Sequence, residues 1–228
     1  MNFELLSFDA DDTLWDCQGH FDHVEEEYCK VLASYDDKDY VSRELFATEK
    51  ANMPVLGYGS KAFTISLIEN AIRVSNGKVS NAEITHIIAL GKTLLQLPAT
   101  PLPGVVETLR ALKQKGKYRM VVFTKGDNQD QEGKFHRSGL EEYFDDCVVV
   151  ADKTRREYVR LCNLFDTDIS RMCMIGNSYK SDILPVLQLG GYAIHIPYKL
   201  MWKMEQTEEA DHPHLTRIDN FKDLLEVL

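Results

Sequence analysis

The spacing of apolar residues changes twice along the chain. Residues 5–8 form a short, nearly continuous apolar run that ends at Asp9, the pattern of a buried strand whose carboxyl end opens onto a site. Residues 16–98 then repeat apolar positions every three to four residues, which predicts amphipathic helices. From residue 99 onward, short apolar runs alternate with helical patterns, which predicts strands and helices in turn.

The helical block carries its own start and stop signals. Ser80 and Glu83 have the spacing of a capping box at the start of its last helix. Asn76-Gly77 is a typical helix end. Residues 53–60 contain one Pro and two Gly, so we expect a loop there.

The rest of the chain predicts a parallel sheet. The expected strands cover residues 119–123, 147–151, 172–175 and 192–196, in addition to the first, and the expected helices cover 105–115, 127–137, 154–164 and 181–189. Right-handed crossovers place such strands in one sheet with helices on its faces. The predicted fold is α/β, a Rossmann-like parallel sheet formed by residues 1–15 and 99–228, with an all-helical insertion of residues 16–98.

Composition and charge narrow the class of protein. The 228 residues are 44% hydrophobic and 27% charged, as in globular proteins with a sizeable core. A net charge of -10 disfavours nucleic acid and anionic membranes as partners. Five cysteines without a C-x-x-C pair indicate free thiols. With no leader pattern and no apolar run near the ~20 residues of a membrane span, we expect a cytoplasmic monomer or homodimer.

Three carboxylates follow the first predicted strand, at Asp9, Asp11 and Asp12. On an extended backbone alternate side chains share a face, so Asp9 and Asp11 can converge on one point while Asp12 turns away. Two like charges ~4 Å apart cost roughly 4 kcal/mol at an effective dielectric constant near 20. We therefore expect a cation beside them; the alternative is a surface turn in which Thr13 caps a helix.

Polar residues also follow the later strands. Thr124, Lys125 and Gly126 end the second predicted strand, where a hydroxyl and free amides can cradle a phosphate; a plain strand-to-helix turn is the alternative. Lys153 follows the third strand, before the Thr154-x-x-Glu157 spacing of a helix start. Ligands of such sheets bind beyond the carboxyl ends of the strands. These residues are therefore candidates for one site.

The motifs, in this order, resemble those of the haloacid dehalogenase-like hydrolases. Residues 9–14, Asp-Ala-Asp-Asp-Thr-Leu, are similar to the first motif of that superfamily. The resemblance implies that Asp9 is a nucleophile and Asp11 a general acid and base. Thr124 stands at the position of the second motif, and Lys153 at that of the third, where a lysine offsets the negative charge of nucleophile and phosphate.

The segment 176–182, Gly-Asn-Ser-Tyr-Lys-Ser-Asp, is similar to the fourth motif. Asn177 stands where an acid is usual, and Asp182 matches the second acid of the motif. The resemblance implies a Mg²⁺ site formed by Asp9, Asp11, Asn177 and Asp182. With an amide in place of one carboxylate, this site has one less negative charge.

The position of the helical block is similar to that of the cap that many members of the superfamily place over the active site. Within it, the loop that contains Tyr58 and Lys61 is the segment we expect to face the substrate; a plain interhelical turn is the alternative. The substrate contacts expected in all are Tyr58, Lys61, Thr124, Lys125, Gly126 and Lys153.

The resemblance implies a Mg²⁺-dependent phosphatase that acts on a small phosphorylated metabolite through an aspartyl-phosphate. A 2-haloacid dehalogenase of the same fold needs neither a metal nor an acid two residues after the nucleophile, so Asp11 and Asp182 count against it. A phosphomutase of this fold would keep Asp11 and the helical cap, so it remains an alternative. A non-catalytic module that binds a phosphorylated metabolite is the alternative from another class, with Asn177 as the sign of lost activity.

Overall fold

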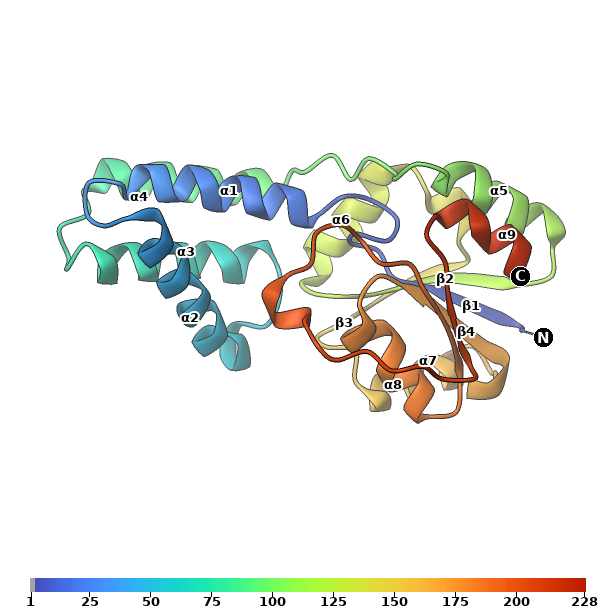
Figure 1. Ribbon diagram of the computed structural model, residues 1–228. Coiled ribbons are helices and arrows are strands. Elements are labelled where there is room, and N and C mark those ends of the chain that lie inside the picture. The colour runs from blue at the N-terminus through green and yellow to red at the C-terminus, as the bar shows by residue number, and fades with distance from the viewer. Residues whose placement is uncertain (1–2) are drawn as a thin grey trace. The chain divides into compact units, whose positions relative to one another are not determined.

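The computed structural model describes residues 3–228 and divides into two compact units (Figure 1). The first, here called the core unit, consists of the chain up to Gln18, Pro98–Lys125 and Gln131–Leu228. The second, here called the helical unit, consists of Gly19–Leu97 and Gly126–Asp130. The helical unit therefore also includes a short segment that directly follows the second strand of the sheet.

The core unit is built on a six-stranded sheet of order β3-β2-β1-β4-β5-β6. Its strands are β1 (Leu5–Phe8), β2 (Arg119–Lys125), β3 (Asp146–Val150), β4 (Met172–Gly176), β5 (Tyr192–His195) and β6 (Leu215–Arg217). Every neighbouring pair is parallel. All four residues of β1 are buried, because β2 and β4 pair with it on either side and helices cover both faces of the sheet. The predicted α/β, Rossmann-like class is confirmed.

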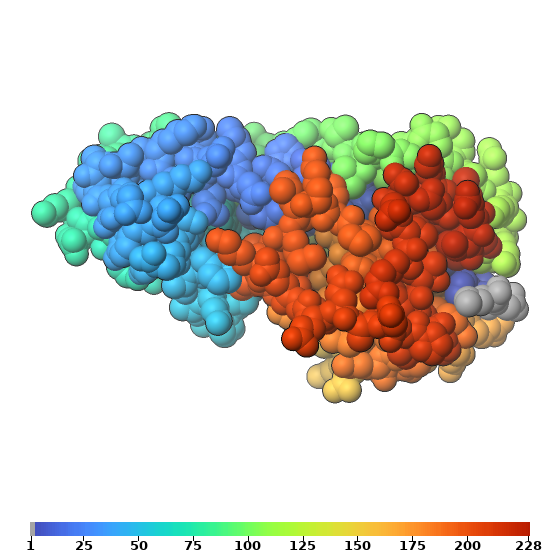
Figure 2. Space-filling view, viewed as in Figure 1, coloured from blue at the N-terminus to red at the C-terminus, as the bar shows by residue number. Residues whose placement is uncertain are grey.

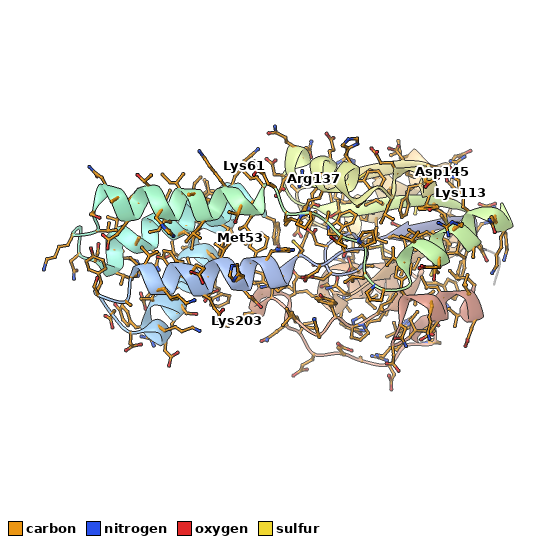
Figure 3. The ribbon with its side chains drawn as sticks, turned by 90° about the horizontal axis from the view of Figure 1, so that it is seen from above. Met53, Lys61, Lys113, Arg137, Asp145 and Lys203 are labelled. Carbon is orange, nitrogen blue, oxygen red and sulfur yellow. The ribbon has the colours of Figure 1, made fainter. Side chains whose placement is uncertain are left out.

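Helices cover both faces of this sheet. They are α5 (Val105–Lys115), α6 (Asn128–Ser138), α7 (Arg155–Leu164), α8 (Leu184–Gln188) and α9 (Leu224–Val227). Figure 1 shows α7 and α8 on one face and α5 and α9 on the other. Tyr158 of α7 packs on Phe123 of β2 with ring centroids 5.0 Å apart. On the opposite face, Lys113 of α5 lies 3.0 Å from Asp145, which precedes β3 (Figure 3).

One strand was not predicted. β6 pairs with β5, so the strand expected to be last is followed by another. β6 has three residues, Leu-Thr-Arg, none of them fully buried. A strand this short shows no alternation of apolar and polar positions, which is why the sequence pattern did not reveal it. The segment of residues 196–214 joins the two strands, and its orange-red part lies on the surface of the core unit (Figure 2).

The helical unit contains the four helices α1 (Gln18–Val31), α2 (Lys38–Leu56), α3 (Ser60–Val74) and α4 (Asn81–Leu94). Each presents an apolar face to a common core, to which Tyr28, Leu45, Leu67 and Ile87 contribute fully buried side chains. The predicted capping box at the start of α4 is present.

The loop predicted at residues 53–60 is shorter than expected. α2 continues through Pro54 to Leu56, so the chain turns only over Gly57–Gly59. Pro54 has no N–H to donate to the carbonyl four residues earlier, and α2 ends two residues after it. Gly57 and Gly59 have φ values of 69° and 114°, a backbone conformation that strongly favours glycine.

No helix among residues 3–228 is both long and apolar enough to cross a membrane.

Candidate active site

The carboxyl end of β1 lies where the strand order of the sheet reverses. From β1 the chain moves to β2 and β3 on one side, and it returns to β4, β5 and β6 on the other. Ligands of open α/β sheets bind at such a point. Asp9 directly follows β1, Lys125 ends β2 and Asn177 directly follows β4.

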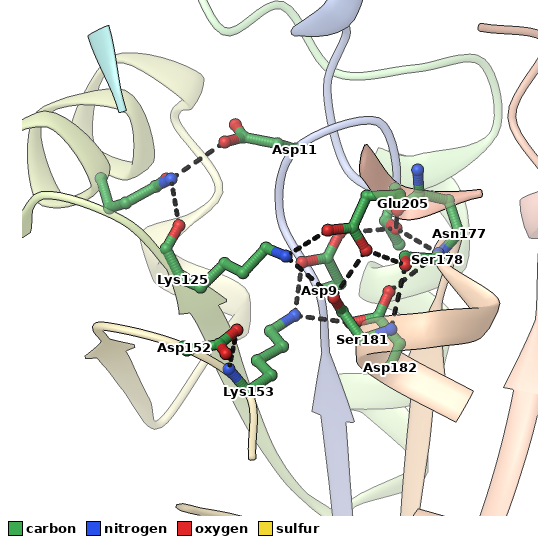
Figure 4. A network of polar contacts seen from close by, with 12 residues as sticks. Asp9, Asp11, Lys125, Asp152, Lys153, Asn177, Ser178, Ser181, Asp182 and Glu205 are labelled. Atoms are coloured by element: carbon green, nitrogen blue, oxygen red, sulfur yellow. Dashed lines mark hydrogen bonds and ion pairs between the residues drawn. The ribbon is translucent and has the colours of Figure 1, made fainter. Parts of the chain in front are cut away.

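Asp9 and Asp182 share one lysine (Figure 4). Nζ of Lys153 lies 2.5 Å from Oδ1 of Asp9 and 2.7 Å from Oδ1 of Asp182. All three side chains are at least nine-tenths buried. Thr154 caps α7 by accepting the Glu157 backbone N–H, and this fixes the backbone next to Lys153. With both carboxylates ionised, the single ammonium leaves a net negative charge at the end of β1.

The pKa of Asp9 reflects its burial and its position beside Lys153 and Asp182. Burial and, next in size, the Asp182 carboxylate raise the pKa of Asp9 to about 7, although Lys153 acts in the opposite direction. For Lys153, burial lowers the pKa, but the two carboxylates outweigh burial and the net shift is upward. A further positive charge at this point would favour the ionised form of Asp9.

Thr13 and Gly176 hold the surrounding groups. The Thr13 hydroxyl lies 3.0 Å from Oδ2 of Asp9 and 3.2 Å from Oδ1 of Asn177, and it accepts the Asn177 backbone N–H at 3.0 Å. A methyl group on Gly176 would lie 2.3 Å from Oδ2 of Asp182. Only glycine therefore lets the Asp182 carboxylate pack against the end of β4.

Asp11 belongs to a separate group. Its carboxylate accepts from Nε1 of Trp15 at 2.8 Å, Nε2 of Gln131 at 2.9 Å and Nζ of Lys134 at 2.6 Å. Lys134, from α6, is only 2% exposed. Burial alone would raise the pKa of Asp11, but the contact with Lys134 outweighs burial and lowers it. In Figure 4 the Asp11 carboxylate points away from Asp9.

The backbone explains why Asp9 and Asp11 diverge. The chain turns from Ala10 onward, because the Ala10 carbonyl accepts the backbone N–H groups of Thr13 and Leu14 at 3.2 and 2.8 Å, so Asp11 lies in a turn and not in an extended strand. The Asp12 carboxylate accepts the backbone N–H groups of Cys17 and Gln18, at 2.8 and 3.0 Å, where α1 begins. The expectation that the side chains of Asp9 and Asp11 meet at one point assumed an extended chain. The structure does not bring the Asp11 carboxylate to the group around Lys153.

Lys125 is held by a residue that the sequence did not single out. Its Nζ lies 2.5 Å from Oε1 of Glu205 and 2.8 Å from the Ser181 hydroxyl (Figure 4). Glu205 lies in the segment 196–214, which has no regular hydrophobic period. Thr124 is buried near the end of β2, and Gly126 has a φ of 144°.

The candidate residues of the predicted loop lie in the helical unit. Nζ of Lys61 is 3.0 Å from Oδ1 of Asp127 and 3.2 Å from Oε1 of Gln129. Tyr58 is half-buried between Gly57 and Gly59. Within this unit, the segment that follows β2 is therefore bonded to the start of α3.

His195 is a second residue that the sequence did not single out. It ends β5 and is fully buried. Its Nε2–H donates to the backbone carbonyl of Asn177 at 2.9 Å, which fixes the turn after β4. The available signal was its position, since the carboxyl ends of parallel strands meet at one edge of the sheet.

The oxygen atoms around Lys153 fit a hard cation. Among residues 3–228, no three His, Cys, Asp or Glu side chains form a metal cluster by themselves. The donors at the end of β1 are the carboxylates of Asp9 and Asp182 and the side-chain amide of Asn177, which Thr13 links to Asp9. Oxygen donors and a net negative charge match the preference of Mg²⁺, which takes few protein ligands and keeps several waters.

These motifs, their order and the fold define a class of enzyme. The chain belongs to the haloacid dehalogenase-like hydrolases, whose family sequence profile matches residues 3–190.

Three relatives can be named. Pyrimidine 5'-nucleotidase YjjG of Escherichia coli is 26% identical over 207 residues, which cover 83% of this chain and 84% of that protein. Glyceraldehyde 3-phosphate phosphatase of Methanothermobacter thermautotrophicus is 24% identical and covers 99% of both chains. The crystal structure of a haloacid dehalogenase-like family hydrolase from Xanthomonas campestris is 33% identical, with a TM-score of 0.88 over 99% of this chain and 91% of that one.

Proposed function

We propose that this hydrolase is a Mg²⁺-dependent phosphatase that cleaves a small phosphomonoester. The observation that carries the proposal is the buried group of Asp9, Lys153 and Asp182 at the carboxyl end of β1. The names of the relatives from Escherichia coli and Methanothermobacter thermautotrophicus support it, since the first is a nucleotidase and the second a phosphatase of a phosphorylated three-carbon compound.

In the first step, a carboxylate oxygen of Asp9 attacks the phosphorus atom. The P–O bond to the leaving group breaks, and an aspartyl-phosphate forms. A carboxylate that approaches a phosphate dianion at ~4 Å meets a repulsion of roughly 8 kcal/mol at an effective dielectric constant of 20. Lys153 lies 2.5 Å from Asp9 and offsets part of this repulsion.

Asp11 is the proposed acid and base. It protonates the leaving oxygen and then removes a proton from the water that hydrolyses the aspartyl-phosphate. The basic half of this role matches the ionised state that Lys134 favours. The acidic half requires Asp11 to take up a proton against the effect of Lys134.

Asp9, Asn177 and Asp182 would hold Mg²⁺. When bound, the ion supplies positive charge beside Asp9 and the phosphate. The Thr124 hydroxyl and the backbone amide of Gly126 are the proposed contacts of the phosphate oxygens. Asp11 is not assigned to the metal through its carboxylate, because that group is bonded to Lys134, Gln131 and Trp15.

We further propose that the helical unit acts as the cap, with Tyr58 and Lys61 as its contacts to the substrate. Its support is the position of the unit, which is inserted between β1 and β2. A cap encloses the substrate during the reaction, so this arrangement favours small molecules.

The test is a phosphate-release assay over nucleoside monophosphates, sugar phosphates and triose phosphates, with Mg²⁺ and with a chelator. We expect Mg²⁺-dependent release from at least one class, and none from Asp9→Asn. Chloride release from a 2-haloacid without phosphate release would identify a dehalogenase instead. Conversion of one sugar phosphate into its isomer without free phosphate would identify a phosphomutase.

A further inference from the structure

Glu205 joins the two strands that flank β1. It reaches the core from the segment 196–214, which follows β5. Its Oε1 accepts from Lys125 at the end of β2. Its Oε2 accepts from the hydroxyls of Ser178, in the turn after β4, and of Ser181, in the π-helical segment Tyr179–Ile183, at 2.5 and 2.6 Å (Figure 4). Because β2 and β4 are the neighbours of β1, this one carboxylate connects both sides of the nucleophile's strand.

The contact between Glu205 and Lys125 is shielded from water. Their side chains are 12% and 16% exposed. Burial alone would raise the pKa of Glu205, but Lys125 and the two serine hydroxyls outweigh it and lower the pKa to about 2. Glu205 is therefore a full negative charge at pH 7, and it offsets the positive charge of Lys125.

We propose that Glu205 is a positioning residue that also masks the charge of Lys125, which leaves Lys153 as the cation that acts on Asp9. This role replaces the substrate contact that the sequence predicted for Lys125. This inference rests on the proposed phosphatase function. An unmasked ammonium next to the site would hold inorganic phosphate after hydrolysis and slow its release. Glu205 therefore sets how tightly this site holds an anion, while its two serine contacts keep the turn after β4 in place.

Other contacts hold the segment 196–214 to the core unit. The Tyr198 hydroxyl donates to Oδ1 of Asp16 at 2.9 Å, and Nζ of Lys180 donates to the Met204 carbonyl at 2.6 Å. Neither contact uses the Glu205 carboxylate. A Glu205→Gln variant, which keeps the size of the side chain and one acceptor oxygen, is therefore expected to fold.

The kinetic test compares Glu205→Gln, Lys125→Met and the double variant. In Glu205→Gln the unmasked Lys125 should lower both KM and the inhibition constant of inorganic phosphate, by about three- to tenfold. The double variant carries neither charge, so both constants should return close to those of the parent. The difference should shrink as salt is added. Glu208→Gln removes an exposed carboxylate of the same segment and should change neither constant.

A purely structural role of Glu205 predicts no decrease in KM or in the inhibition constant of inorganic phosphate. If Glu205 only supported the turn after β4, its loss would leave KM and the phosphate inhibition constant unchanged or raise them, and removal of Lys125 would not restore them. Either result would overturn the masking of Lys125.

A second measurement does not depend on catalysis. The two single variants and the double variant form a cycle in urea unfolding, which isolates the contact between Glu205 and Lys125. We expect a coupling of about tenfold or more in the unfolding equilibrium constant. The matched control is the exposed pair Lys113 and Asp145, 41% and 39% exposed, for which about two- to fivefold is expected.

The two measurements separate the two proposals. Additive effects of Glu205→Gln and Lys125→Met on unfolding would show that the pair does not act as a unit, and the inference would fail. If the parent protein releases no phosphate from any substrate, the proposed function fails, and the unfolding cycle still decides the pairing of Glu205 with Lys125.

Discussion

Asp9 and Asp11 are two residues apart in the chain, yet their surroundings differ in one decisive respect. Asp9 shares Lys153 with a second carboxylate, Asp182, whereas Asp11 forms its ion pair with Lys134. The pKa of Asp9 is raised to about 7 by burial and by Asp182, while the pKa of Asp11 is lowered because Lys134 outweighs burial. The second carboxylate beside Lys153 therefore distinguishes the surroundings of Asp9 from those of Asp11. In the usual division of roles the acid has the raised pKa and the nucleophile is ionised. Here the order is reversed, so the proposed roles require a further positive charge beside Asp9 that favours its ionised form.

The largest loss of activity should follow from removing Asp9, the proposed nucleophile. Asp9→Asn keeps the shape of the side chain but removes the nucleophile, so kcat should fall by about 10⁴-fold or more. Steady-state phosphate release measures the loss. Asp12→Asn is the control, because Asp12 bonds the start of α1 and not the group around Lys153. A comparable loss in both variants would mean that the first motif is only structural.

Removing the shared cation should have the next largest effect. Lys153→Met leaves Asp9 and Asp182 as two buried carboxylates without their common ammonium. We expect kcat to fall by roughly 10²- to 10³-fold, because a preorganised charge at the reacting group is lost. Circular dichroism and thermal unfolding should confirm that the variant is folded. A loss seen only in KM would instead assign Lys153 to substrate binding.

The effect of removing the Asp11 carboxylate should depend on the leaving group of the substrate. Asp11→Asn should reduce kcat by about 10- to 100-fold on an alkyl phosphate, whose leaving oxygen needs a proton. With an activated aryl phosphate the loss should be smaller, because that leaving group departs without one. The ratio of the two losses is the quantity to measure. Equal losses on both substrates would remove Asp11 from the role of acid.

Glu205 extends the comparison, because, like Asp11, it forms an ion pair with a lysine, here Lys125. Its pKa is lowered to about 2 in the folded protein, against an ordinary value of 4.5. Its stabilising effect is therefore complete above pH 4.5 and is lost as the pH falls towards 2. The free energy of unfolding of the parent should exceed that of Glu205→Gln by about 2–3 kcal/mol at pH 6, a gap that should close by pH 2. A gap that does not depend on pH would contradict the low pKa.

The smallest effect should follow from adding a negative charge beside Asp9 and Asp182. Asn177→Asp places a third carboxylate beside Asp9 and Asp182, which should strengthen the attraction for Mg²⁺. The concentration of Mg²⁺ for half-maximal activity should fall by about two- to tenfold, the range expected when one ligand among several waters gains a charge. If the two titrations superimpose, Asn177 does not contact the metal.

Local patterns were enough to identify the framework. The apolar run of β1, the helix 105–115 and the capping box of α4 appear where the sequence predicts them, because each depends on residues within one or two turns or a single strand. The alternation of strands and helices after residue 99 likewise implied a parallel sheet. The structure adds the order of the strands, with β1 at the centre.

Only the folded structure shows which lysine pairs with each carboxylate. Asp11 and Lys134 are 123 residues apart, and Lys125 and Glu205 are 80 apart, so no periodicity links the members of either pair. The sequence predicts a helix over residues 127–137 but no role for Lys134 within it, and the segment of Glu205 has no regular hydrophobic period. The sequence by itself placed the reactive groups at the ends of the strands, because hydrophobic spacing is a local property. Which lysine each carboxylate receives depends on distances that exist only after the chain has folded, and these distances separate Asp9 from Asp11.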